Sequence, residues 1–303
     1  MTKKYLLGFI GQGWVGKNYA DHFEDRGFTV VRYSLEEPYV HNKEEIAKCD
    51  IVFIAVPTPT TPDGFDDRYI RSVIDLVGRG KVAVIKSTIP PGTTRRLAKE
   101  HTDKFIIHAP EFLREAFARH DVDHPERVFV GIPDLSEEYK KWGKVVLDIH
   151  PKAPHSEMVS AEEAEFIKYV HNTMGYSLIV FTNLLYDLAQ KHGVEWAKVK
   201  EAITNNPWYP SKYIDPVHKG GRGAGGACFI KDFATLRHTY EQDLPNDVEG
   251  LALLRAFEAK NNQMLRDSGK DIGILDGVYG MRGEGIDKDI TAIEEIITEK
   301  EAN

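Results

Sequence analysis

The sequence predicts an α/β protein in which a doubly wound parallel sheet is followed by a helical domain with one long helix. Three observations support this fold class. Strand and helix signals alternate through the first half of the chain, a glycine motif follows the first strand signal, and a long proline-free stretch begins at Ser160. With 303 residues, the chain is too long for one small core and fits about two domains of ordinary size.

Composition and charge restrict the class of protein. A net charge of −8 argues against a nucleic-acid-binding surface, which needs clustered Lys and Arg. No apolar run reaches the about eighteen residues of a membrane-spanning helix, and the opening MTKKYLLGFIGQG lacks a signal-peptide cleavage site. The two cysteines, Cys49 and Cys228, favour a reducing compartment over a disulfide framework. We therefore expect a cytoplasmic protein that binds neither nucleic acid nor membrane, and we assign no metal site.

The first strand signal, YLLGFIG, runs directly into the motif GQGWVG at residues 11–16, and a helical stretch and a second apolar run follow. This is G-x-G-x-x-G in a strand–turn–helix context. Gly11 allows the tight turn, Gly13 lets a pyrophosphate approach the backbone, and Gly16 lets the helix pack on the strand. The unpaired N–H groups of the helix N-terminus favour an anion. The motif therefore predicts a dinucleotide site in a Rossmann domain.

Four further strand signals lie at residues 49–59, 81–92, 104–112 and 128–132, and the first three end in polar or proline-rich loops. Ligands of doubly wound sheets gather at the carboxyl ends of the strands. Those ends carry VPTP, KSTIPPG and PEFLRE, so the polar groups of these three loops are site candidates. Cys49, at the entry to a strand, is predicted to be a small buried core residue.

The end of the second strand leaves the choice between NAD and NADP open. An Asp or Glu normally binds the ribose hydroxyls there, but this sequence has Tyr33, preceded by Arg32. An arginine at this place can accept the 2′-phosphate of NADP. Alternatively, Arg32 is simply a solvated residue at the strand end.

The second half of the chain begins with a predicted helix of about thirty residues. Ser160 and Glu163 form a capping-box pattern at its start, and Gly193 is a natural stop. Lys168 and Asn172 are four residues apart and share one face of this helix. Burying them is costly unless something pairs with them, so the alternative is an exposed polar stripe.

The segment GGRGAGGACFIKD, residues 220–232, places Cys228 at or just before a helix whose first turn holds Lys231 and Asp232. The helix dipole and a neighbouring lysine both favour a thiolate there. The glycines let backbone N–H groups line a concavity for an anion. The alternative is a flexible linker with an incidental buried cysteine.

Together these motifs resemble the nucleotide-sugar 6-dehydrogenases, the UDP-glucose and GDP-mannose dehydrogenase family. The matching segments occur in the family's order over about residues 5 to 270: GFIGQGWVG, DIVFIAVPTPTTPDG, IKSTIPPGTT, APEFLREA, PERVFVG, EAEFIKYVHNT and GGACFIKD. The family oxidises a primary alcohol on a nucleotide-bound sugar to a carboxylate, using two NAD molecules in turn and a cysteine nucleophile. The resemblance implies NAD as the cofactor, a sugar nucleotide or related sugar as the substrate, and a homodimer packed through the long helix.

The resemblance also implies a role for each matching residue. Cys228 corresponds to the nucleophile, Lys168 and Asn172 to the groups that stabilise the developing oxyanion, and Thr88 and Glu115 to the pair that positions water. Asp232 corresponds to the aspartate that supports this water and the lysine. The implied cofactor contacts are Gly11, Gln12, Gly13, Trp14, Val15, Gly16, Arg32, Tyr33, Val56, Pro57, Thr58, Ser87, Thr88 and Lys231. The implied substrate contacts are Glu111, Phe112, Leu113, Arg114, Glu115, Lys168, Asn172, Gly225 and Gly226.

The chain also departs from the family pattern. The stretch DIGILDGVYG resembles the first strand of a third, nucleotide-gripping domain, but Gly280 replaces its lysine and the segment EGIDKD lacks the family's arginine. We therefore expect a Rossmann domain over residues 1–155, a helical substrate and dimerisation domain over 156–265, and a truncated remnant over 266–303. Two alternatives are a two-electron 3-hydroxyacid-type dehydrogenase, against which Cys228 argues, and an inactive binding or scaffold remnant of the family.

Overall fold

The computed structural model describes residues 5–208 and 212–280, which form two compact units. Of the described residues, the first unit contains those up to Thr58 and Asp66–Lys168, and the second contains Pro59–Phe65 and those from Tyr169 to Gly280. The expected boundary near residue 155 falls before the last strand of the first unit, which continues to Ser160.

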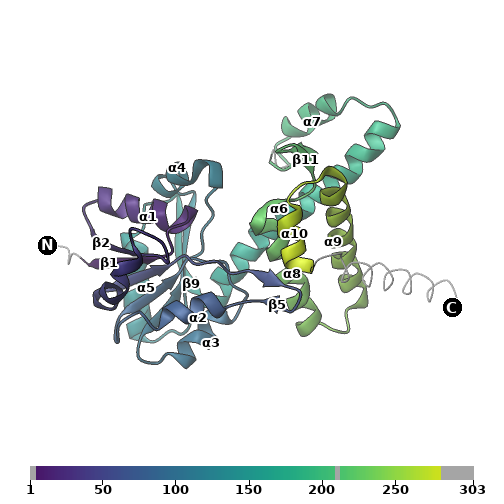
Figure 1. Ribbon diagram of the computed structural model, residues 1–303. Helices are drawn as coiled ribbons and strands as arrows, with labels where there is room; N and C mark the ends of the chain where they lie inside the picture. Colours follow the sequence, from purple (N-terminus) through teal and green to yellow (C-terminus); the bar gives the residue numbers. More distant parts are fainter. Residues whose placement is uncertain (1–4, 209–211, 281–303) are drawn as a thin grey trace. The chain divides into compact units, whose positions relative to one another are not determined.

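A seven-stranded sheet forms the centre of the first unit (Figure 1). Its order is β2 (Thr29–Tyr33), β1 (Leu6–Ile10), β3 (Ile51–Ile54), β6 (Val82–Ile85), β7 (Phe105–His108), β8 (Arg127–Ile132) and β9 (His155–Ser160). The predicted doubly wound sheet is confirmed, with one correction. Five of its six strand pairs are parallel, but β7 pairs with β8 in antiparallel fashion at His108 and Gly131. One antiparallel junction of this kind is common in large doubly wound sheets.

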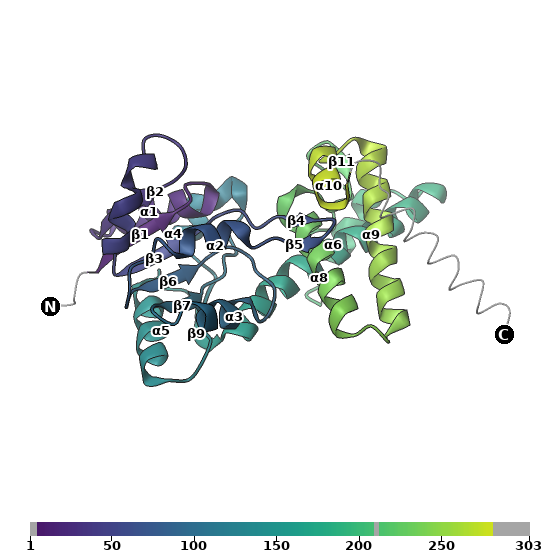
Figure 2. The ribbon, with the colours of Figure 1, turned by 60° about the horizontal axis from the view of Figure 1, so that its bottom comes forward.

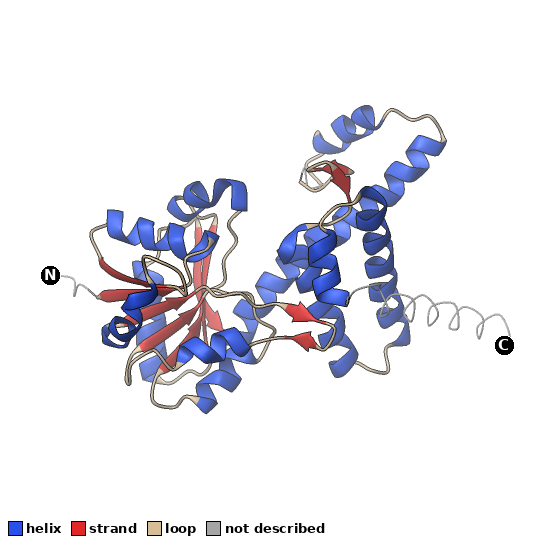
Figure 3. Cartoon of the chain, viewed as in Figure 1, coloured by secondary structure: helices blue, strands red, loops and turns tan. Residues whose placement is uncertain are grey.

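Helices cover the sheet of the first unit (Figure 3). They are α1 (Trp14–Asp25), η1 (Val40–Lys48), α2 (Arg68–Ile74), α3 (Thr93–Glu100), η2 (Glu115–Phe117), α4 (Ala118–Asp123) and α5 (Glu137–Ile149). Between α1 and the strands, the rings of Phe9, Phe23 and Phe53 stack with centroids 4.9 and 5.4 Å apart. Cys49 is completely buried at the entry to β3, as predicted.

The second unit is mainly helical (Figure 2). Its elements are the hairpin β4 (Thr60–Thr61) and β5 (Gly64–Phe65), the helices α6 (Ala161–Lys191), α7 (Trp196–Thr204), α8 (Gly226–Asp243), α9 (Val248–Ser268) and α10 (Ile272–Tyr279), and the hairpin β10 (Val217–His218) and β11 (Gly221–Arg222). Helix α6 begins in the first unit and confirms the predicted long helix with 31 residues. The capping box is present, because Ser160 N donates to Glu163 Oε2 at 2.8 Å and Glu163 N donates to Ser160 Oγ at 3.3 Å.

The segment after α9 corrects a prediction. We expected DIGILDGVYG to be a strand, but Ile272–Tyr279 forms the helix α10. A strand needs a partner for its backbone N–H and C=O groups, whereas a helix pairs them internally. The helical spacing also buries Leu275, Val278 and Tyr279 against α8 and α9. The segment EGIDKD, and the stretch IDKDITAIEEIITEK that was expected to be the first helix of the third domain, lie outside the described residues.

Within residues 5–208 and 212–280, each helix is too short or too polar to cross a membrane.

A buried carboxylate anchors the first turns of α6 to the sheet unit. Glu165 is fully buried, and its two oxygens accept hydrogen bonds from Gly92 N at 2.6 Å, Thr94 N at 2.7 Å and Thr94 Oγ1 at 2.6 Å. These donors belong to the N-terminal end of α3, where backbone N–H groups lack partners within the helix. Glu165 therefore caps α3 from another element, one turn before Lys168.

We expect Glu165 to make stability depend on pH. Burial raises the pKa of its carboxyl group to about 7, from an ordinary value of 4.5. Between these pH values the folded state binds the proton more tightly, so the free energy of unfolding should fall by about 2–3 kcal/mol as pH rises from 4.5 to 7. The Glu165→Gln side chain cannot ionise, so this part of the pH dependence should be absent from the variant. Urea denaturation at several pH values between 4.5 and 7 measures the free energy of unfolding and hence its slope against pH. An unchanged slope in the variant would contradict the assignment.

Candidate active site

The glycine motif forms a cradle at the end of β1. Gly11 has a φ of 88°, and its N–H donates to Tyr33 O at 2.9 Å. A Cβ on Gly16 would lie 1.9 Å from Gly11 O, so only glycine lets α1 start so close to the strand. A Cβ on Gly13 would meet nothing within 4 Å, so the backbone at the N-terminus of α1 is open to a ligand. These features fit a bound pyrophosphate, and Gly13 would hold it.

The loops that follow β3 and β6 are joined by side chains that were predicted to contact the cofactor. Thr58 Oγ1 donates to Thr88 O at 2.9 Å, and Ser87 Oγ donates to Val56 O at 2.7 Å. These bonds place Val56-Pro57-Thr58 beside Ser87-Thr88 at the carboxyl edge of the sheet. At the cradle itself, Gln12 Nε2 donates to Gly11 O at 3.0 Å, Trp14 is 60% exposed, and Val15 packs against the core.

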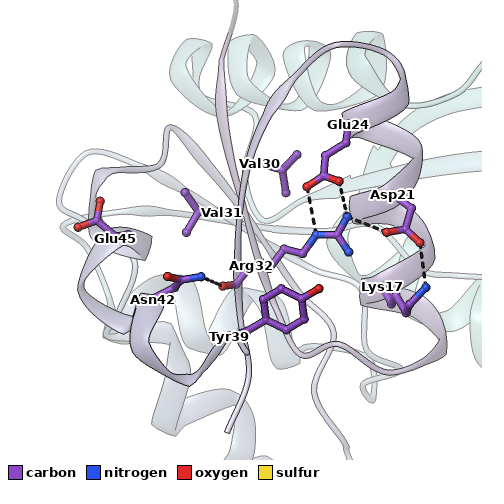
Figure 4. Close-up of a pocket in the computed structure, with 9 residues that line it drawn as sticks. All are labelled: Lys17, Asp21, Glu24, Val30, Val31, Arg32, Tyr39, Asn42 and Glu45. Carbon is purple, nitrogen blue, oxygen red and sulfur yellow. Dashed lines mark hydrogen bonds and ion pairs between the residues drawn. The ribbon is translucent and has the colours of Figure 1, made fainter. Parts of the chain in front are cut away.

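Arg32 is held by carboxylates of α1 (Figure 4). Its guanidinium donates to both oxygens of Glu24, at 3.2 and 2.6 Å, and lies 2.7 Å from Asp21 Oδ1. The side chain is only 9% exposed and lines a cavity of about 630 Å³ between α1, β2 and η1. It is therefore not a solvated strand end. To bind a 2′-phosphate, Arg32 would have to leave two carboxylates, and these would repel the phosphate.

We expect Arg32→Met to leave cofactor preference unchanged. The variant should bind NAD at least tenfold more tightly than NADP, as the wild type should, because Asp21 and Glu24 disfavour a 2′-phosphate in both. It should also lose about 1–3 kcal/mol of stability, since two partly buried carboxylates lose their cation. Titration of both cofactors against both proteins, with a thermal melt, checks this. A tenfold preference for NADP in the wild type that disappears in Arg32→Met would show instead that Arg32 binds the phosphate.

The predicted substrate loop, residues 111–115, is anchored by Glu111 and by the buried Lys86. Glu111 Oε1 accepts hydrogen bonds from Phe112 N at 2.8 Å and Leu113 N at 2.9 Å, while Glu111 Oε2 lies 3.2 Å from Lys86 Nζ. The Lys86 side chain is 2% exposed, and its ammonium lies 4.1 Å from the centre of the Tyr19 ring. Burial lowers the pKa of Lys86 despite the neighbouring carboxylate. Lys86 therefore holds the loop from the interior of the sheet unit.

Sequence reasoning missed Lys86, although a lysine directly after the buried strand VAVI is a signal that could have found it.

Phe112 links this loop to Lys168. The Lys168 ammonium lies 5.2 Å from the centre of the Phe112 ring, and the Arg127 guanidinium lies 4.7 Å from it. Both distances are within the range of a cation–π contact. Lys168 is only 8% exposed, so it does not belong to an exposed polar stripe. Arg127, at the start of β8, was not among the predicted site residues.

The other two charged residues of the loop lie at its exposed end. The Arg114 guanidinium donates to both oxygens of Asp121, at 2.7 and 2.9 Å, and Arg114 holds the pKa of that carboxyl at about 2. Glu115 begins η2 and is exposed. The loop is therefore closed at one end by Lys86 and Glu111 and at the other by Arg114 and Asp121.

A second set of candidates lies in the helical unit. Cys228 is exposed in the first turn of α8. One turn further, the fully buried Asp232 accepts a hydrogen bond from Asn172 Nδ2 at 2.6 Å on one oxygen and pairs through the other with the Lys231 ammonium. Asn172 is 5% exposed, so it too does not belong to an exposed stripe. Because α8 begins at Gly226, Lys231 and Asp232 lie in its second turn rather than its first.

The site candidates therefore form two groups. Thr88, the loop 111–115 and Lys168 belong to the first unit, and Asn172, Cys228 and Asp232 to the second. Lys168 and Asn172 are one turn apart on the continuous helix α6.

The open glycine cradle on a doubly wound sheet defines the class of dinucleotide-binding proteins. The chain belongs to the UDP-glucose/GDP-mannose dehydrogenase family. The model of the family's NAD-binding domain matches residues 38–148, and the model of its central domain matches residues 162–263. NAD is thus the cofactor of this family's first domain, as predicted.

Similar proteins place the chain within this family. It is 30% identical over 236 residues to a putative UDP-glucose 6-dehydrogenase, YtcA, of Bacillus subtilis. The matched region covers 74% of this chain and 53% of that protein. The structure of a UDP-glucose dehydrogenase from Pyrobaculum islandicum is 28% identical, with a TM-score of 0.74 over 88% of this chain and 70% of that one. The chain thus spans about half the length of the curated relative it matches.

A solved 3-hydroxyisobutyrate dehydrogenase of Mycobacterium tuberculosis has the same fold at 16% identity, with a TM-score of 0.67 over 92% of this chain and 99% of that one.

Proposed function

We propose that this chain supports the NAD-dependent oxidation of a primary alcohol to a carboxylate, on a sugar nucleotide or a related sugar, through a covalent intermediate on Cys228. The observation that carries the proposal is the arrangement of polar residues at the start of α8. The exposed Cys228 lies one turn before the buried Asp232, which pairs with Lys231 and with Asn172 of α6. An exposed cysteine in the first turn of a helix is accessible for nucleophilic attack on a bound substrate.

The first oxidation would take the alcohol to the aldehyde level. Two NAD molecules, bound in turn at the glycine cradle, would supply the hydride acceptors for this oxidation and for the next. The Cys228 sulfur would then add to the aldehyde carbon, forming a C–S bond, and the resulting oxygen would be stabilised by Lys168 and Asn172. Loss of a second hydride would leave a thioester.

Hydrolysis would complete the cycle. Water would attack the thioester carbon and the C–S bond would break, which regenerates the Cys228 thiolate and releases the carboxylate product. Glu115 would accept the proton of this water, and Thr88 and Asp232 would position it. Lys86 and Arg127 would act indirectly, by holding the loop 111–115 and Phe112 against Lys168.

A panel of sugar nucleotides tests the proposal. UDP-glucose, UDP-N-acetylmannosamine and GDP-mannose would each be incubated with the protein and NAD, with NADH and product mass measured. Formation of an acid with two NADH per product supports the proposal. One NADH per product, or turnover of a 3-hydroxyacid instead, would favour the two-electron alternative, whose fold this chain shares over nearly its whole length. Binding without turnover would indicate the inactive alternative.

We also propose that the chain forms a homodimer through α6. Met174, Phe181, Leu185 and Leu188 are 67, 52, 44 and 57% exposed, and their spacing places them along one side of the helix. An exposed apolar stripe of this length is typical of an interaction surface. Light scattering at micromolar concentration should give twice the mass of 34.3 kDa, and Phe181→Asp should give the monomer mass. A monomeric wild type would remove the proposal.

We also propose a cytoplasmic location, because both cysteines of the chain are free thiols, as is usual in a reducing compartment.

A further inference from the structure

The glycine loop before Cys228 is fixed by the end of α9 and the residues that follow it. The buried Asn261 accepts a hydrogen bond from Ala224 N at 2.7 Å and donates one to Ala224 O at 3.1 Å. Lys270 Nζ donates to Gly223 O at 2.8 Å. Two neighbouring residues of the loop are thus held by side chains, so the loop is not a flexible linker.

Asp271 supplies the next anchor, and it caps a helix other than its own. It occupies the N-cap position of α10 but makes no side-chain hydrogen bond to that helix. Instead, its Oδ2 accepts from Gly226 N, the first residue of α8, at 2.8 Å. The N-cap residue of α8 is Gly225, which has no side chain to do this. Asp271 therefore provides the cap that α8 lacks.

The loop and its clamp fit each other sterically. A Cβ on Gly225 would lie 2.1 Å from Asp271 Oδ2 and 2.7 Å from Lys270 Cε. Glycine at this position is thus required by the close approach of these two side chains. Asp271 itself has a φ of 55°, a left-handed conformation that Asp and Asn adopt more readily than other residues with a side chain. This backbone conformation accompanies the side chain's contact with α8.

We propose that Asp271 is a positioning residue for Cys228. It caps the first amide of α8, and Cys228 follows two residues later in the same turn, so loss of the cap would let this turn fray and move the thiol. Lys270 and Asn261 hold the preceding residues of the loop. The segment after α9 is thus part of the support of the nucleophile. The catalytic meaning of this support rests on the proposed function, whereas the anchoring of the loop does not.

Two variants separate the hydrogen bond from the backbone conformation. Asn and Gly both tolerate the left-handed conformation, but only Asp271→Asn keeps an oxygen acceptor for Gly226 N. Amide hydrogen exchange of the full chain would be followed in a peptide spanning residues 221–229, with peptides of β3 and α10 as controls. We expect exchange in the loop peptide to accelerate at least tenfold in Asp271→Gly and to stay within threefold of wild type in Asp271→Asn. The β3 peptide should not change.

Turnover gives the functional readout. With the sugar nucleotide that the panel identifies, kcat should fall at least tenfold in Asp271→Gly and recover in Asp271→Asn, while the KM for NAD stays within twofold. Wild-type loop exchange in Asp271→Gly, or equal kcat losses in both variants, would overturn the proposal. If the wild type oxidises no sugar nucleotide, the proposed function is refuted, but the proposal that Asp271 positions Cys228 is not. The exchange data, and the rate at which iodoacetamide alkylates Cys228 in each variant, then decide the role of Asp271.

Discussion

Replacing Cys228 by serine is expected to lower the net conversion of alcohol to carboxylate by at least about 10³-fold, the scale seen when a catalytic unit loses one member. The thiol is exposed in the first turn of α8, so a substrate can reach it. A serine hydroxyl is far less nucleophilic at neutral pH, and an ester formed on it would turn over slowly. Product mass and NADH yield at saturating substrate measure the loss.

The Cys228→Ser protein should still bind NAD with the affinity of the wild type. The glycine cradle belongs to the first unit, whereas Cys228 belongs to the second, so the substitution leaves the cradle intact. A matched control is Cys49→Ser, which replaces a completely buried cysteine and should affect stability rather than chemistry. Carboxylate formation at the wild-type rate by Cys228→Ser would refute the covalent mechanism and favour the two-electron alternative.

The two cysteines should also differ in reactivity. Burial raises the pKa of the Cys49 thiol to about 11, so it is neither accessible nor ionised near neutral pH. Iodoacetamide should therefore label Cys228 in the native protein and reach Cys49 only after unfolding, as peptide mass mapping would reveal. Rapid labelling of Cys49 in the native protein would contradict this prediction. It would show that the segment before β3 opens often enough to expose the thiol.

The sequence predicted the elements whose signals are local. The G-x-G-x-x-G turn and the Ser160–Glu163 capping box each depend on residues within a few positions of one another, and both are present. The position of Cys228 in a helical first turn was predictable for the same reason, because the glycines before it and the periodic stretch after it mark a helix start.

The features that escaped prediction depend on residues far apart in the sequence. The sequence left Arg32 open as a phosphate ligand, because its pairing with Asp21 and Glu24 joins a strand to the preceding helix and has no local signal. The stretch of α10 has the apolar content of a buried strand, and only its packing on α8 and α9 decides in favour of a helix. Asp271 and Gly226 are 45 residues apart in the sequence, so no local pattern predicts the hydrogen bond between them.

The second large effect concerns the buried ion pair beneath the loop 111–115. Lys86→Met should destabilise the protein by about 3 kcal/mol, because it leaves the Glu111 carboxylate, whose side chain is only 12% exposed, without its cation. Methionine has nearly the length of the lysine stem and can still pack against Tyr19. Urea denaturation measures the change in the free energy of unfolding.

A double variant tests whether the charge pairing is the cause. In Lys86→Met with Glu111→Gln, no unpaired buried charge remains, and the glutamine oxygen can still accept from Phe112 N and Leu113 N. The double variant should therefore recover most of the loss, since replacing both partners of a buried ion pair is often nearly neutral. Additive losses from the two substitutions would show that the two side chains are not energetically coupled and would contradict the charge-pairing explanation.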